Sequence, residues 1–203
     1  WEDIVWGLLP PLINPLMSIF PEKIKNILIT GGSGFIGGNL IRRLLLNTRL
    51  NIFNLDKLSY ASDLWSIKRL ESEVPSISKR YKLLEVDLAD SKETQRAIEL
   101  SNPDLVFHLA AESHVDRSIL GPQIFLESNI IGTYNLLESL LIHWEKLTIE
   151  RKDNFRMLHV STDEVFGSLE NEGLFSEKSP YDPKSPYSAT KAASDHLVKA
   201  WNH

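Results

Sequence analysis

Short apolar runs alternate with segments of helical periodicity along the chain. Five runs have the length and composition of buried strands: residues 25–30, 50–55, 83–86, 105–109 and 157–160. Apolar residues at three- and four-residue spacing predict helices after residue 38, near 65–74, over 91–100, over 122–144 and from 186 onward. Strands separated by helices predict repeated βαβ units, and therefore an α/β fold with a doubly wound parallel sheet.

The first predicted strand runs directly into a glycine-rich turn. Gly32, Gly34 and Gly37 have the G-x-G-x-x-G spacing of a dinucleotide-binding fingerprint, and Gly31, Gly34 and Gly37 form a variant spaced by three. Glycine permits a tight turn and lets backbone N–H groups approach a diphosphate at the helix N-terminus. The strand, turn and helix together predict a Rossmann-type fold.

An acidic residue ends the second predicted strand. Asp56 follows Gly37 by nineteen residues, which is where a carboxylate accepts the hydroxyls of the adenosine ribose. Because Asp56 would repel a 2′-phosphate, NAD is favoured over NADP as the cofactor. The positive charge of Lys57 beside it would instead attract a 2′-phosphate and so favour NADP.

The fifth strand opens into a hydroxyl and two carboxylates, Thr162, Asp163 and Glu164. Parallel α/β sheets bind ligands beyond the carboxyl ends of their strands, so these side chains are candidates for chemistry. Tyr187 and Lys191 are four residues apart and share one helical face. A phenolate base needs help, since the pKa of tyrosine is near 10, and a neighbouring ammonium and an oxidised nicotinamide both favour the charged form.

Composition narrows the class of protein. The 203 residues include 22 Lys and Arg against 27 Asp and Glu, without a basic cluster, so nucleic acid is not expected as a partner. The absence of Cys removes disulfides and thiolate chemistry, and it fits a cytoplasmic location. The six His show no ligand spacing, so no metal is expected.

The N-terminal segment has an unusual composition. Glu2 and Asp3 stand where a signal peptide would be basic, and three prolines interrupt any membrane-spanning helix. We therefore expect neither export nor a membrane anchor. Residues 1–24 are expected to be an extension outside the fold, with Met17 as the native start, and residues 25–203 to be an NAD-binding Rossmann domain that carries the catalytic residues.

The motifs resemble those of the extended short-chain dehydrogenase/reductase superfamily, and within it the NAD-dependent nucleotide-sugar 4,6-dehydratases. The matching segments are residues 30–37, 56–58, 110–119, 129–133, 161–167 and 185–198. The Ser-Thr-Asp-Glu-Val segment is the most specific of them. Two positions depart from the family pattern: Phe166 stands where the family usually has Tyr, and Ser128 where it has Thr.

The resemblance implies a site and a substrate. The catalytic residues would be Thr162, Asp163, Glu164, Tyr187 and Lys191. Ser113 and Thr162 would contact the sugar of a nucleoside-diphosphate glucose, with dTDP-glucose favoured. The implied NAD contacts are Gly31, Gly34, Phe35, Ile36, Gly37, Asp56, Lys57, Leu58, Ser59, Asp87, Leu88, Leu109, Ala110, Ala111, Ser113, Ser128, Tyr187 and Lys191.

The implied reaction explains the paired acids. Tyr187 takes the proton of the sugar 4-hydroxyl as NAD takes the hydride, Glu164 removes the proton at carbon 5, and Asp163 protonates the departing 6-hydroxyl. Opposite roles require different pKa values for the two carboxyls. Relatives continue beyond this point into a lobe that grips the nucleotide, so we expect a truncated domain with little turnover, and a homodimer formed through the helix over 122–144.

Three alternatives remain open from the sequence. A UDP-glucose 4,6-dehydratase would keep both acids. A nucleotide-sugar 4-epimerase or decarboxylase would share the glycine turn and Tyr187 but generally lack the Asp163–Glu164 pair. A non-catalytic NAD-binding remnant would bind cofactor and do no chemistry.

Overall fold

Five parallel strands form the centre of the fold in the computed structural model, which describes residues 20–21, 23–169 and 173–201. Their order across the sheet is β3-β2-β1-β4-β5, the arrangement of a doubly wound α/β fold. The strands are β1 (Asn26–Thr30), β2 (Asn51–Asp56), β3 (Tyr81–Glu85), β4 (Leu105–His108) and β5 (Arg156–His159). Both the fold class and the parallel pairing predicted from the sequence are confirmed.

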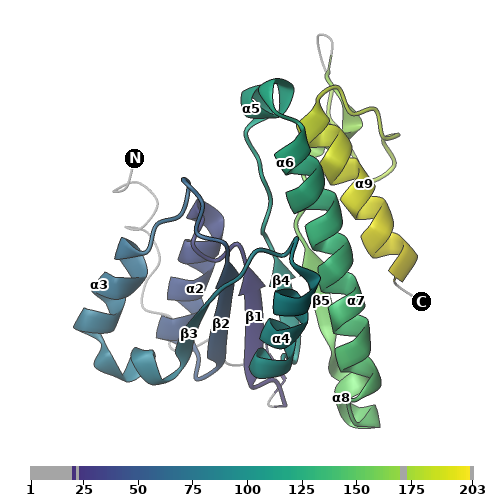
Figure 1. Cartoon of the computed structure of the whole chain (residues 1–203). Helices are drawn as coiled ribbons and strands as arrows, with labels where there is room; N and C mark the ends of the chain where they lie inside the picture. Colours follow the sequence, from purple (N-terminus) through teal and green to yellow (C-terminus); the bar gives the residue numbers. More distant parts are fainter. Residues whose placement is uncertain (1–19, 22, 170–172, 202–203) are drawn as a thin grey trace.

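Helices cover both faces of the sheet (Figure 1). The longer ones are α2 (Phe35–Asn47), α3 (Trp65–Glu73), α4 (Ser91–Ser101), α7 (Gly132–Glu145) and α9 (Pro186–Trp201). One core cluster joins β1 and β2 to α2 and α3, for example through Ile29, Ile41 and Ile67. A second joins the other face to α4 and α7, through Leu28, Ile98 and Leu136. Burial from both sides is why the three central positions of β1, Ile27 to Ile29, are all apolar.

The shorter helical segments are α5 (Val115–Leu120), α6 (Gln123–Phe125), α8 (Ile149–Asn154), the 3-10 turns η2 (Pro75–Lys79) and η4 (Asp163–Phe166), and the π-helical η3 (Leu126–Ile131). The single helix predicted over 122–144 is thus divided into α6, η3 and α7. A π-helical stretch carries one more residue per hydrogen-bonded turn, so it changes which side chains face the sheet. α5 and α8 were not predicted, since each is too short to show a period.

The fifth strand differs from its prediction. Its composition indicated a buried strand, yet within the described residues β5 pairs with β4 alone, at one edge of the sheet. Leu158 is 52% exposed, whereas its neighbour Met157 packs against the second core cluster. Residues 1–19 and 22 of the expected N-terminal extension lie outside the described residues, whereas Phe20 and Ile24, just before the expected domain boundary, pack against the first core cluster.

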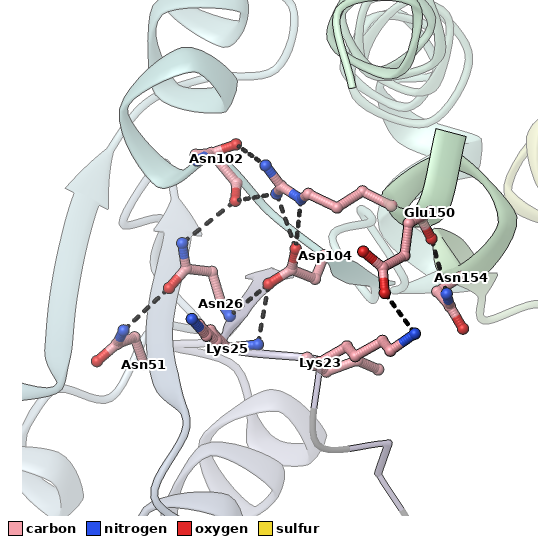
Figure 2. Close-up of a pocket in the computed structure, with 10 residues that line it drawn as sticks. Lys23, Lys25, Asn26, Asn51, Asn102, Asp104, Glu150 and Asn154 are labelled. Atoms are coloured by element: carbon pink, nitrogen blue, oxygen red, sulfur yellow. Dashed lines mark hydrogen bonds and ion pairs between the residues drawn. The ribbon is translucent and has the colours of Figure 1, made fainter. Parts of the chain in front are cut away.

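The amino edge of the sheet holds a hollow of about 560 Å³ that is lined by polar side chains (Figure 2). Asp104 is the common acceptor there: its Oδ2 receives the N–H groups of Lys25 and Asn26 at 2.9 and 3.0 Å. The guanidinium of Arg151 donates to the other oxygen at 2.9 Å and to Asn102 at 3.0 Å. These polar groups are hydrogen-bonded to one another, and their bonds join the starts of β1 and β4 to α8.

A candidate cofactor and catalytic site at the carboxyl edge

The turn after β1 requires glycine at specific positions. Gly31 has a φ of +69°, and a Cβ there would lie 2.6 Å from the backbone N of Ala110. A Cβ on Gly37 would lie 2.3 Å from the carbonyl O of Gly31, which is why the start of α2 can approach the turn so closely. Gly34 differs, since a Cβ would meet only one atom, at 3.3 Å. The turn is thus closed toward the sheet and open on the side of Gly34.

The N-terminus of α2 points into this open side. Its N-cap residue, Gly34, offers no side-chain acceptor to the first N–H groups of the helix. Phe35 and Ile36, the first two helical residues, are 88% and 62% exposed. Free N–H groups and the helix dipole favour an anion at such a position.

Asp56, the last residue of β2, is held in place by its neighbours. Its carboxylate accepts the N–H of Ser33 at 2.9 Å, the N–H of Leu58 at 2.9 Å and the hydroxyl of Ser62 at 3.1 Å. Leu58 reaches it because its backbone adopts a left-handed φ of 54°. The carboxylate is therefore fixed at the carboxyl edge beside the glycine turn.

A cleft of about 400 Å³ runs along this edge from the glycine turn to α9. It is lined by every residue predicted to contact NAD except Leu58, which acts instead through its bond to Asp56. The sequence reasoning missed several lining residues: Leu55, Ala61, Ser62, Val86, Glu112, Val160 and Ser161. Ser62 could have been inferred from its nearness to Asp56 in the sequence, whereas Glu112 depends on the pairing of distant strands.

An ion pair crosses the cleft between the ends of β2 and β4. The Nζ of Lys57 lies 2.9 Å from Oε1 of Glu112 and donates to Oγ of Ser128 at 3.3 Å. Glu112 is held from behind by Asn129 on η3, whose amide accepts its N–H at 2.8 Å and donates to its carbonyl at 3.0 Å. The π-helical stretch therefore supplies two of the contacts that shape this wall.

Tyr187 and Lys191 come from the first turns of α9 and both line the cleft. Lys191 is 3% exposed, and its Nζ donates to the carbonyl O of Val160 at 2.7 Å. Burial lowers the pKa of Lys191 from its ordinary value of 10.5 to about 8, although the nearby Asp195 opposes the shift. This ammonium is therefore close to losing its proton under mildly alkaline conditions.

The pKa of Tyr187 is raised above its ordinary value of 10.0. Burial is the main cause; a hydrogen bond with Thr162 acts against it, and the carboxylates of Glu164 and Asp163 add to the rise. This direction is opposite to the one expected from a neighbouring ammonium, because burial is the largest influence on the pKa of Tyr187. A positive charge placed beside the phenol would be needed to reverse it.

The two acids lie near Tyr187 without lining the cleft. Asp163 and Glu164 open the 3-10 turn η4, which Thr162 caps by accepting the N–H of Glu164 at 3.3 Å. Both carboxylates act electrostatically on the phenol of Tyr187 and raise its pKa. Of the five predicted catalytic residues, Tyr187 and Lys191 line the cleft. Thr162, Asp163 and Glu164 follow directly after Ser161, which lines it, and interact with the phenol of Tyr187.

A cluster around Asp195 lies behind these residues and was not predicted. Asp195 accepts the hydroxyls of Ser161 at 2.5 Å and Tyr181 at 3.1 Å, and Nε2 of His159 lies 3.2 Å from its other oxygen. Burial alone would raise the pKa of Asp195, but hydrogen bonds from His159 and Ser161 lower it overall. Its position four residues after Lys191 was the available signal, since it shares that helical face.

A second buried network supports the end of β4. His108 is 1% exposed, with Nδ1 2.6 Å from the hydroxyl of Thr30 and Nε2 3.0 Å from that of Thr133. Burial lowers the pKa of His108 well below 6.5, and the nearby His159 and Lys191 lower it further. His108 is therefore neutral and joins β1, β4 and α7, which is the structural role expected for a strand histidine.

Comparison with known proteins places this geometry in a family. The family whose model matches is described as GDP-mannose 4,6 dehydratase, and the match covers residues 28–203. The chain belongs to this family. Among curated relatives, it is 48% identical over 181 residues to a dTDP-glucose 4,6-dehydratase of Neisseria gonorrhoeae, a match that covers 89% of the chain and 51% of that protein.

Other dehydratases are also similar to this chain. A dTDP-glucose 4,6-dehydratase of Salmonella typhimurium is 50% identical over 184 residues, covering 86% of the chain and 50% of that protein. The solved dTDP-glucose 4,6-dehydratase of Streptomyces venezuelae, with NAD and TYD bound, is 37% identical and superposes with a TM-score of 0.73 over 86% of the chain and 51% of that structure. The chain spans about half the length of the curated relatives it matches.

Two further findings concern the described part of the chain. None of its helices is both long and apolar enough to cross a membrane. Within the same residues, no three His, Asp or Glu side chains gather in a way that could ligate a metal ion.

Proposed function

We propose that this chain is the NAD-binding and catalytic part of a nucleotide-sugar 4,6-dehydratase whose substrate is dTDP-glucose. The observation that carries the proposal is that Tyr187 and Lys191 line one end of a cleft that begins at a dinucleotide-type glycine turn. Thr162, Asp163 and Glu164 act on the phenol of Tyr187 from the segment that follows β5. The relatives reported above bear the names of this activity.

The cleft fits NAD in three places. The uncapped N-terminus of α2 beside Gly34 suits a diphosphate. Asp56 suits the adenosine ribose, although its hydrogen bond from Ser62 would rearrange. The far end, at Tyr187 and Lys191, would receive the nicotinamide, and the solved relative from Streptomyces venezuelae holds NAD.

In the proposed reaction, NAD when bound accepts a hydride from carbon 4 of the glucose and returns it to carbon 6. Tyr187 accepts the proton of the 4-hydroxyl, and Thr162, in hydrogen-bond contact with the phenol, orients that hydroxyl. Lys191, one helical turn after Tyr187, carries a positive charge at neutral pH and donates to the carbonyl O of Val160. The ketone formed at carbon 4 makes the hydrogen at carbon 5 acidic.

The acids complete the elimination. Glu164 accepts the carbon 5 proton and Asp163 donates a proton to the carbon 6 hydroxyl, which leaves as water. As the hydride reaches carbon 6, Glu164 returns a proton to carbon 5. The proton that Tyr187 took from the 4-hydroxyl balances the one that Asp163 gave up, so all three residues regain their starting states. Burial and the nearby carboxylates raise the pKa of Tyr187, so the positive ring of an oxidised nicotinamide held beside it would favour its ionised form. Proton transfer is thereby coupled to cofactor binding.

We also propose a domain boundary, an oligomeric state and a cellular location for the protein. Residues 25–203 are proposed as the cofactor domain, and the half of the relatives that this chain does not cover would grip the nucleotide. A homodimer through the helical stretch α6–η3–α7 is proposed because that stretch exposes apolar side chains, including Leu126, Ile131 and Leu141. A cytoplasmic location is proposed because NAD and nucleotide sugars are found there.

An isotope experiment tests the activity. The protein expressed from its complete coding sequence is incubated with dTDP-glucose that carries deuterium at carbon 4. The proposal predicts a 4-keto-6-deoxy product with deuterium at carbon 6. Deuterium kept at carbon 4 with inverted configuration would indicate an epimerase instead, and no conversion with intact NAD binding would indicate a non-catalytic module.

The epimerase alternative has weaker support. A UDP-Glc/GlcNAc 4-epimerase of Campylobacter jejuni superposes equally well, with a TM-score of 0.73, but at 28% identity. The fold is therefore common to both activities. Asp163 and Glu164 beside the phenol favour the dehydratase, because epimerisation has no use for an acid and a base at carbons 5 and 6.

A further inference from the structure

Glu112 is a carboxylate buried in the wall of the cleft, with 6% of its surface exposed. Its side chain pairs with Lys57 at 2.9 Å, while its backbone N–H and C=O are bonded to Asn129. A buried charge is stable only with a partner. The ion pair with Lys57 is thus the interaction that this carboxylate is placed to make.

Lys57 stands at a position that matters for cofactor choice. It follows Asp56, the residue placed to meet the adenosine ribose, and a cation near that point is what binds the 2′-phosphate of NADP in related folds. Here Nζ is directed instead to the end of β4, where it meets Glu112 and Ser128. Its charge is compensated before any cofactor enters.

We propose that Glu112 sets the preference for NAD over NADP by holding Lys57 across the cleft and neutralising it. The inference rests on the dinucleotide site of the proposed function and adds a second element to its specificity. Asp56 repels a 2′-phosphate, and Glu112 withdraws the cation that would attract one. Glu112 acts through Lys57 and is a positioning residue.

The test is a ratio of dissociation constants. NAD⁺ and NADP⁺ are titrated by calorimetry into the wild-type chain, Glu112→Gln, and the double variant Glu112→Gln with Lys57→Met. Freeing one ammonium beside a doubly charged phosphate is expected to lower the NADP⁺/NAD⁺ ratio of Kd values by about tenfold in the single variant. The double variant is expected to return to the wild-type ratio.

Glu150→Gln is the matched control. It removes the same charge and frees Lys23 at the opposite edge of the sheet, so the ratio should not change. If the near-UV circular dichroism of Glu112→Gln shows loss of the fold, Glu112→Met replaces it in the same comparison.

The outcomes separate two failures. A wild-type chain that binds neither dinucleotide would refute the proposed cofactor site itself. Wild-type binding of NAD⁺ with an unchanged ratio in a folded Glu112 variant would overturn the role of Glu112. So would a changed ratio that persists after Lys57→Met.

Discussion

The buried ammonium of Lys191 should make stability depend on pH. Its pKa is about 8 in the folded protein and 10.5 when unperturbed, so the unfolded chain binds more protons between these values. Stability therefore rises with pH in this window. Below pH 8 the full cost of burying the charge is present, and above pH 10.5 it has disappeared.

The magnitude follows from the two pKa values. Between about pH 7 and about pH 9.5, the linkage relation gives a gain of about 2 kcal/mol in the free energy of unfolding from this one group. Tyrosine ionisation is still minor in this range. Lys191→Met removes the titrating group, so the difference in unfolding free energy, wild type minus variant, should increase by that amount.

Urea denaturation at the two pH values measures the effect. Lys199→Met, an exposed lysine on the same helix, is the matched control and should follow the wild type at both. If the difference between wild type and Lys191→Met were the same at both pH values, Lys191 would titrate alike in the folded and unfolded states. Burial would then not lower the pKa of Lys191 in the folded protein.

Four further substitutions have defined outcomes. Asp195→Asn should lower the pKa of Lys191 further, because the Asp195 carboxylate raises that pKa. NMR titration of ¹³C-methylated lysine measures the shift. An unchanged pKa would show that the two groups are uncoupled. Gly31→Ala should cost at least about 2 kcal/mol of stability, because Gly31 has a positive φ and a Cβ there would clash with the backbone. Gly34→Ala should cost less than about 1 kcal/mol and chiefly weaken NAD⁺ binding. Equal losses of stability for the two variants, measured by chemical denaturation, would contradict the geometry. Asp104→Asn should lower the free energy of unfolding by about 2 kcal/mol in chemical denaturation, since it weakens hydrogen bonds from two backbone N–H groups and a guanidinium. A loss below about 0.5 kcal/mol would show that these bonds are dispensable.

The predictable parts of the site are those encoded locally. The glycine turn, the helix after it and Asp56 lie within one βαβ unit, so spacing alone locates them. Tyr187 and Lys191 are one helical turn apart, and the start of α9 at Pro186 was predicted correctly. Strand type and order of elements follow from the apolar periods.

The unpredicted parts depend on contacts between distant segments. Lys57 and Glu112 meet only because β2 and β4 both flank β1. Asp195 gathers Ser161 and Tyr181 from two separate loops. The rise in the Tyr187 pKa likewise comes from burial and from acids brought near by folding, which no local pattern could indicate.

The central claim is that cofactor, phenol, ammonium and both acids meet at one end of this cleft. A crystal structure of the chain with NAD⁺ tests it most directly. We expect the diphosphate at the N-terminus of α2, the adenosine ribose at Asp56 and the nicotinamide against Tyr187 and Lys191, with the carboxylates of Asp163 and Glu164 directed to the same space. A nicotinamide bound elsewhere, or either acid turned away from it, would contradict the claim.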